Sequence, residues 1–86
     1  MSNHINERTM NKQRRKRLED VISKLEELQV EVSSIQEEEQ EAFDNMTDGL
    51  QQSERGQTIE ENADDLENAD SDFETLLDGL REILER

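Results

Sequence analysis

Apolar residues in the first half of the chain recur at alternating spacings of three and four residues. The series, with its one charged member, is Leu18, Val21, Leu25, Leu28, Val32, Ile35, Glu39, Ala42 and Met46. This spacing is typical of a helix that packs along one seam against another helix. We therefore predict a long helix over about residues 11–45, preceded by a flexible tail over residues 1–10. Ile22 and Phe43 flank the seam, and Val30 lies nearly opposite it.

A second apolar stripe with helical spacing fills the last third of the chain. It comprises Ile59, Ala63, Leu66, Ala69, Phe73, Leu76, Leu77, Leu80, Ile83 and Leu84. Thr58 begins a capping-box sequence, Thr-Ile-Glu-Glu, and Ser53 is a competing N-cap. We predict a second helix over about residues 58–86, which continues through Gly79 at a cost of about 1 kcal/mol relative to alanine.

Residues 46–57 separate the two stripes and contain Gly49 and Gly56. A turn in this segment folds the chain into a long antiparallel two-helix hairpin, so the predicted fold class is all-α. If the turn centres near residue 50, facing residues have numbers that sum to about 101. Apolar residues then meet at nearly every layer, and Glu39 opposite Asn62 forms a partly polar one.

A two-helix hairpin leaves the outer part of each stripe exposed to water. The candidates for a second contact surface are Ile22, Phe43, Leu77 and Leu84. Covering them with a second copy would form a four-helix bundle or coiled coil. We therefore favour a homodimer, with a monomeric hairpin and a higher or hetero-oligomer as the alternatives.

Composition restricts how such a hairpin can be stabilised. The 86 residues suffice for one small domain, and 29% of them are hydrophobic while 40% are charged. Cysteine is absent, and no cluster of metal ligands stands out, so neither a disulfide nor a structural metal is expected. No apolar run approaches the roughly 20 residues of a membrane span. We expect a cytoplasmic protein that engages no membrane.

The net charge of −14 is distributed unevenly. Residues 1–18 hold six basic residues and one acidic residue, whereas residues 19–86 hold 23 acidic and four basic ones. The basic cluster consists of Lys12, Arg14, Arg15, Lys16 and Arg17. It could grip phosphate, but no aromatic residue interleaves with it and the acidic body would repel a duplex. We favour a helix start that pairs with the acidic C-terminus of the other arm, and we do not expect direct nucleic-acid binding.

Signals for catalysis or metal binding are weak. His4 is the only histidine, and no partner for acid–base chemistry lies near it in the sequence. The segment Asp44–Gly49 resembles the start of a calcium loop, but Met46 and Arg55 occupy two positions that should carry ligands. Acidic pairs abound on the predicted helices, but little apolar material is available to wall a pocket around them. We predict no enzymatic activity, no cofactor and no metal.

The turn is the most specific candidate for recognition. Its candidate residues are Leu50, Ser53, Glu54, Arg55 and Gly56. A hydroxyl, an isolated cation and a glycine at a helix start can bind an anion, or a partner protein. The alternative is a capped connector in which Arg55 neutralises Asp44 or Asp48. Turn formation accounts for Gly49 and Ser53, but it does not require the remaining sequence from Leu50 to Gly56.

Two runs of residues resemble a known group of proteins. They are Arg14–Leu28 and Glu38–Gly56, the latter containing Glu-Glu-Gln-Glu-Ala-Phe-Asp-Asn-Met and Ser-Glu-Arg-Gly. Over about residues 11–80 the chain resembles small acidic helical-hairpin proteins encoded by phages, prophages and bacterial genomes. Those proteins often have proline where this chain has Thr47, so we expect a less rigid entry into the loop. The resemblance implies a phage or mobile-element setting and transfers no activity or site residues.

Rigid helices with a strongly acidic surface favour a non-enzymatic interaction protein. In the setting that the resemblance implies, such a protein would bind a host protein in the bacterial cytoplasm and inhibit or modulate it. It could act as an anti-defence inhibitor, or as a DNA mimic whose carboxylates stand in for phosphates. One alternative is a structural or assembly protein of a phage particle. Another is an oligomer that sequesters an anionic small ligand such as a signalling nucleotide.

Overall fold

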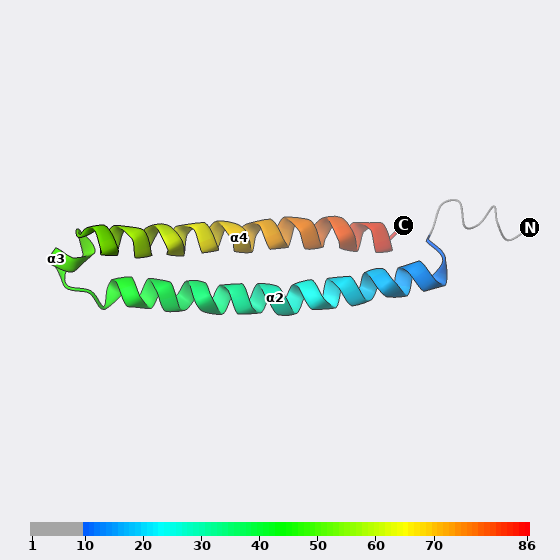
Figure 1. Cartoon of the computed structure of the whole chain (residues 1–86). Coiled ribbons are helices and arrows are strands. Elements are labelled where there is room, and N and C mark those ends of the chain that lie inside the picture. The colour runs from blue at the N-terminus through cyan, green and yellow to red at the C-terminus, as the bar shows by residue number, and fades with distance from the viewer. Residues whose placement is uncertain (1–9) are drawn as a thin grey trace, which may run out of the picture.

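Two long antiparallel helices make up most of the chain. The computed structural model describes residues 10–86 and contains α2 (Lys12–Asp44), α3 (Asp48–Gln51) and α4 (Glu54–Leu84). α2 and α4 lie side by side, α3 lies at the turn, and the C-terminus lies at the same end as the start of α2 (Figure 1). The shape is elongated, with principal-axis extents of 71 × 15 × 14 Å. This confirms the all-α hairpin. The predicted tail lies outside the described residues, apart from Met10.

A side-chain cap begins α2. Asn11 Oδ1 accepts a hydrogen bond from Arg14 N at 2.8 Å. The first turn of α2 is basic and holds no acidic residue, which opposes the helix dipole. Arg15 offsets this across the hairpin, because its Nη1 donates to the carbonyl oxygen of Leu84 at 2.6 Å, where the end of α4 favours a cation. Within residues 10–86 the basic cluster thus meets a carbonyl of α4, and no ion pair joins it to the carboxylates of residues 82–86.

The turn contains a separate one-turn helix. The hydroxyl of Thr47 caps α3 by accepting a hydrogen bond from Leu50 N at 3.4 Å. The hydroxyl of Ser53 caps α4 by accepting a hydrogen bond from Gly56 N at 3.2 Å. α4 therefore begins at residue 54 rather than near residue 58. The competing cap Ser53 is the one used, and Thr58 lies inside the helix.

Gly56 is buried where the start of α4 passes close to α3. A Cβ atom at Gly56 would lie 2.6 Å from the carbonyl oxygen of Gln51, and closer still to that of Leu50. Gly49, by contrast, has no such neighbour within 4 Å of its Cβ position and no positive φ angle. The turn therefore requires glycine at position 56 and not at position 49. The prediction from sequence explained Gly49 by the turn and left Gly56 unexplained.

The seam of α2 is rotated relative to the predicted one. Val21, Leu28 and Ile35 were expected to face the other arm, but they are 45%, 55% and 43% exposed. The positions one residue later, 22, 29, 36 and 43, are buried or half-buried. Both series recur every seven residues, and two of the inward positions are glutamines, so the apolar pattern alone selected the wrong series.

The core of the hairpin is thin. Among the described residues its buried apolar side chains are Ile22, Ala63 and Leu77, and Leu77 is fully buried. The prediction that Ile22 and Leu77 belong to an oligomer surface is therefore wrong, because both pack between the two arms of a single chain. Phe43 and Leu84 are half-buried. The large apolar residues that remain exposed are Val21, Leu28, Val30, Ile35, Leu50 and Leu76.

Candidate interaction surfaces

One edge of the hairpin is closed by hydrogen bonds between the arms. Gln29 Nε2 donates to Glu74 Oε2 at 3.0 Å, and Ser33 Oγ donates to Asp70 Oδ1 at 2.7 Å. The partner numbers sum to 103 in both pairs, which confirms the predicted register to within two residues. We call this side the polar edge; it comprises Glu26, Gln29, Ser33, Asp70, Glu74 and Arg81. Because its side chains already bind one another, this edge serves the hairpin itself.

Arg81 joins three carboxylates at the polar edge. Its Nη2 lies 2.8 Å from Glu26 Oε2 on the other arm, and its Nη1 lies 3.5 Å from Glu74 Oε1 and 3.4 Å from Asp78 Oδ1. The hydrogen bond to Glu26 is the main reason why the pKa of the Arg81 guanidinium is raised. Sequence reasoning did not single out Arg81. The feature of the sequence that could have identified it is that residues 56–85 contain no other cation.

The opposite side of the hairpin exposes an apolar stripe. Leu28 and Ile35 lie about 140° and 160° around α2 from Ser33 of the polar edge, at 3.6 residues per turn. Leu76, which is 49% exposed, lies about 140° around α4 from Arg81. A groove on this side spans both helices and is lined by Ile35, Glu39, Asn62, Asp65 and Leu66. We call the following set the apolar face: Val21, Leu28, Ile35 and Ala42 of α2 with Ala69, Leu76 and Ile83 of α4.

The apolar face has the same period on both helices. Its members recur every seven residues, and Asn62 completes the series on α4. Asn62 Nδ2 donates to Glu39 Oε2 at 3.2 Å, which confirms the predicted polar layer at this point. A seven-residue period keeps side chains in one line along helices that supercoil around each other. The face therefore stays in line along the whole length of the hairpin.

The two ends of the hairpin differ sharply in charge. We call residues 29–73 the loop half and residues 10–28 with 74–86 the open half. The loop half contains fifteen acidic residues and one basic residue, Arg55, whereas the open half contains eight of each. The net charge of −14 therefore resides in the loop half.

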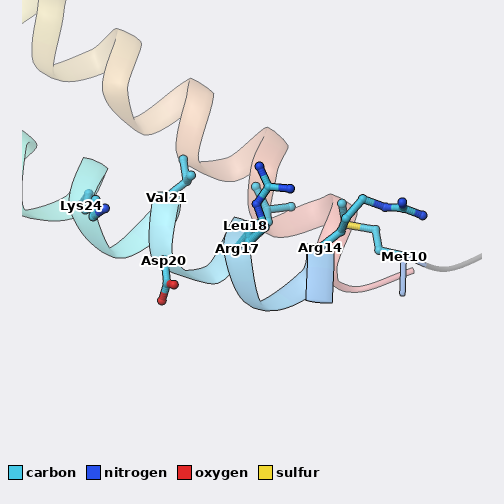
Figure 2. Close-up of a pocket in the computed structure, with 7 residues that line it drawn as sticks. All are labelled: Met10, Arg14, Arg17, Leu18, Asp20, Val21 and Lys24. Carbon is cyan, nitrogen blue, oxygen red and sulfur yellow. The ribbon is translucent and has the colours of Figure 1, made fainter. Parts of the chain in front are cut away.

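Basic side chains border the apolar face in the open half. An open depression there is lined by Met10, Arg14, Arg17, Leu18, Asp20, Val21 and Lys24. Figure 2 shows Arg17 beside Leu18 and Arg14 beside Met10, with Asp20 pointing away from Val21. In the loop half the same face is bordered by acidic side chains, those of Glu39 and Asp65 in the groove described above. The border of the apolar face thus changes sign along the hairpin.

The predicted loop residues divide into two kinds. Ser53 and Gly56 build the turn through capping and close packing. Leu50, Glu54 and Arg55 are exposed, Leu50 to 54%. No carboxylate of residues 10–86 forms an ion pair with Arg55, so its predicted neutralisation by a nearby aspartate is absent. Arg55 stands alone as a cation at the acidic end.

Metal-binding clusters, buried polar side chains and membrane-spanning helices are absent from residues 10–86. Between residues 10 and 86, no three histidine or acidic side chains gather in a geometry that could hold a metal ion. No buried polar or charged side chain occurs in this part of the chain. None of the described helices combines the length and apolar character that a membrane span needs.

Comparison with protein-family models, with curated proteins and with solved structures produced no match.

Proposed function

We propose that this chain is a non-enzymatic interaction protein whose acidic loop half binds a basic surface of a partner protein. The supporting observation is the ratio of fifteen acidic residues to one basic residue over residues 29–73. Carboxylates fixed on rigid helices attract cationic protein surfaces and repel nucleic acid and anionic membranes. Among the described residues, three side-chain carboxylates of this half accept hydrogen bonds, those of Glu39, Asp44 and Asp70. Most of the acidic surface is thus left for a partner.

The phage setting implied by the resemblance makes a host protein the proposed target. A nuclease or another nucleic-acid-binding defence component has the basic surface that this charge distribution fits. In the DNA-mimic form of the proposal, the carboxylates occupy the positions where that protein binds phosphates. Duplex DNA should then compete with the hairpin for the captured protein.

We also propose a homodimer as the working form of the protein. The support is the apolar face, in which a single hairpin leaves Val21, Leu28 and Ile35 of α2 and Leu76 of α4 exposed. The same face favours a second candidate function, a structural role in the assembly of a phage particle. Light scattering after size-exclusion chromatography separates the two, since a binding protein forms a discrete dimer and an assembly protein grows into larger species with concentration.

Two variants of equal net charge test the acidic surface. The loop-half variant carries Glu60→Gln, Glu61→Gln and Asp64→Asn, and the control variant carries Glu19→Gln, Asp20→Asn and Glu82→Gln in the open half; all six positions are exposed. Each immobilised protein is mixed with bacterial lysate at low salt, and the captured proteins are quantified by mass spectrometry. We expect capture of basic proteins to fall about tenfold with the loop-half variant and to stay near wild type with the control. Equal loss in both variants, or no basic protein on the wild type, contradicts the proposal.

A further inference from the structure

We infer that two hairpins pair through the apolar face in antiparallel order, so that the turn of each copy lies beside the open end of the other. This inference rests on the proposed dimer and is independent of the partner protein. It commits the exposed stripe to one occupant, a second copy of the chain. Three observations support it: the extent of the face, the level at which its two series lie, and the sign of the charges along its border.

The extent of the face suits a dimer. The face covers 22 residues of each helix, from Val21 to Ala42 and from Asn62 to Ile83, and the hairpin is about as wide as its smaller extents, 15 and 14 Å. A strip of about 33 Å by 15 Å amounts to roughly 500 Å² for each copy, or roughly 1,000 Å² for both, which meets the ~1,000 Å² total expected of a specific interface.

The two series of the face lie level with each other. Val21 and Ile83 end the face at the open half, and Ala42 and Asn62 end it at the loop half; both pairs of numbers sum to 104. The hydrogen bonds between Ser33 and Asp70 and between Gln29 and Glu74 sum to 103, so these end residues face one another across the hairpin. A two-fold rotation about the common midpoint therefore lays the whole face on itself, as an isologous interface requires.

Charge selects the antiparallel order. With the midpoint of the α2 series between residues 31 and 32, the rotation places Lys24 of one copy level with Glu39 of the other. Glu39 lines the groove of the loop half, so this pairing joins a cation at one end of the face to an anion at the other. A parallel dimer would instead stack two loop halves, each with fifteen acidic residues and one basic residue. Borders in contact lie within the Debye length of about 8 Å at physiological ionic strength, so solvent ions screen this difference only partly.

The chain has no cysteine, so single introduced cysteines report the order of the two copies by energy transfer. Gly49→Cys marks the turn, where a side chain has open space, and Glu82→Cys marks the exposed open end. We expect strong transfer when donor-labelled Gly49→Cys is mixed with acceptor-labelled Glu82→Cys, and weak transfer between two Gly49→Cys chains. The reverse result overturns the antiparallel order.

A label near mid-hairpin separates failure of the order from failure of the dimer. Val30→Cys lies on the outer surface near the middle of α2, so a dimer in either order brings its two labels within transfer range. Transfer with this label is expected. If no transfer occurs with this label, both the dimer and the antiparallel order are wrong. The proposal that the acidic loop half binds a partner is tested separately, by the capture experiment.

Two matched substitutions locate the face. Leu28 is 55% exposed on the apolar face, and Val30 is 70% exposed away from it. We expect Leu28→Gln to raise the dimer dissociation constant at least about tenfold, because each dimer loses two buried leucines, and Val30→Gln to change it less than about twofold. Analytical ultracentrifugation measures both, and circular dichroism checks that helicity is intact. The opposite ranking would place the contact elsewhere.

A charge reversal tests the border. Lys24→Glu should weaken the dimer, and adding Glu39→Lys should restore much of the loss, because the reversed pair again joins opposite charges across the interface. If the second substitution weakens the dimer further, the two residues do not meet and the antiparallel alignment is wrong.

Discussion

Gly56 lies so close to the carbonyl oxygen of Leu50 that no side chain fits between them. The contact joins the first turn of α4 to the single turn of α3. It sets how tightly the chain reverses, because both atoms belong to the backbone and neither can rotate away. The turn is therefore a packed element, in which Ser53 supplies the cap and Gly56 supplies the space.

The first prediction follows from this contact. Gly56→Ala should lower the free energy of unfolding by about 1–2 kcal/mol, since the overpacking cost exceeds the gain in helix propensity. Gly79→Ala is the control, because Gly79 is exposed within α4 and its Cβ position is open. It should raise the free energy of unfolding by about 0.5–1 kcal/mol. Urea denaturation followed by circular dichroism at one protein concentration measures both, and a Gly56→Ala variant as stable as Gly79→Ala would contradict the contact.

The second prediction compares two neighbouring leucines. Leu77 is fully buried between the arms, whereas Leu76 is 49% exposed on the apolar face. Leu77→Ala should cost about 2–4 kcal/mol of hairpin stability, enough to unfold much of a protein with so thin a core. Leu76→Ala should cost less than about 1 kcal/mol in the isolated hairpin. In the proposed dimer Leu76 lies in the contact, so any further effect of Leu76→Ala should grow with protein concentration. Equal effects at high dilution would contradict the rotated seam.

The third prediction concerns the polar edge. Ser33→Ala removes the hydrogen bond to Asp70 and should cost about 0.5–1.5 kcal/mol, measured as a shift of the urea midpoint. Ser34→Ala is the matched control, since Ser34 is exposed and forms no side-chain hydrogen bond among the described residues. It should be neutral or slightly stabilising through helix propensity. If both substitutions shift the midpoint equally, the bond between the arms contributes nothing.

The hairpin itself was predictable because three independent signals agree. Helical spacing, the absence of glycine and proline from residues 11–48, and the pairing of apolar layers all point to two long arms. The register followed from the same pairing, and the bonds of Ser33 and Gln29 confirm it. Val30 was placed on the outside, and it is 70% exposed.

The rotation of α2 was not predictable from apolar spacing. Val21 and Ile22 begin two series that are one residue apart, and each continues with a seven-residue period. Leu28 makes the first series more apolar, but Gln29 of the second forms a hydrogen bond to Glu74 on the other arm. A polar side chain with a partner thus occupies an inward position that a hydrophobicity pattern assigns to solvent. The apolar face was missed for the same reason, because the residues that the pattern assigned to the inside are exposed on that face.

The uneven charge of the two halves gives the hairpin a permanent electric dipole moment along its long axis. The peptide dipoles of α2 and α4 run in opposite directions and largely cancel, so the moment arises from the side chains. A single hairpin that approaches a basic surface is therefore turned loop-first before contact, which speeds association at low ionic strength. In an antiparallel pair the two moments oppose each other, and the molecule then offers an equivalent acidic end in either direction.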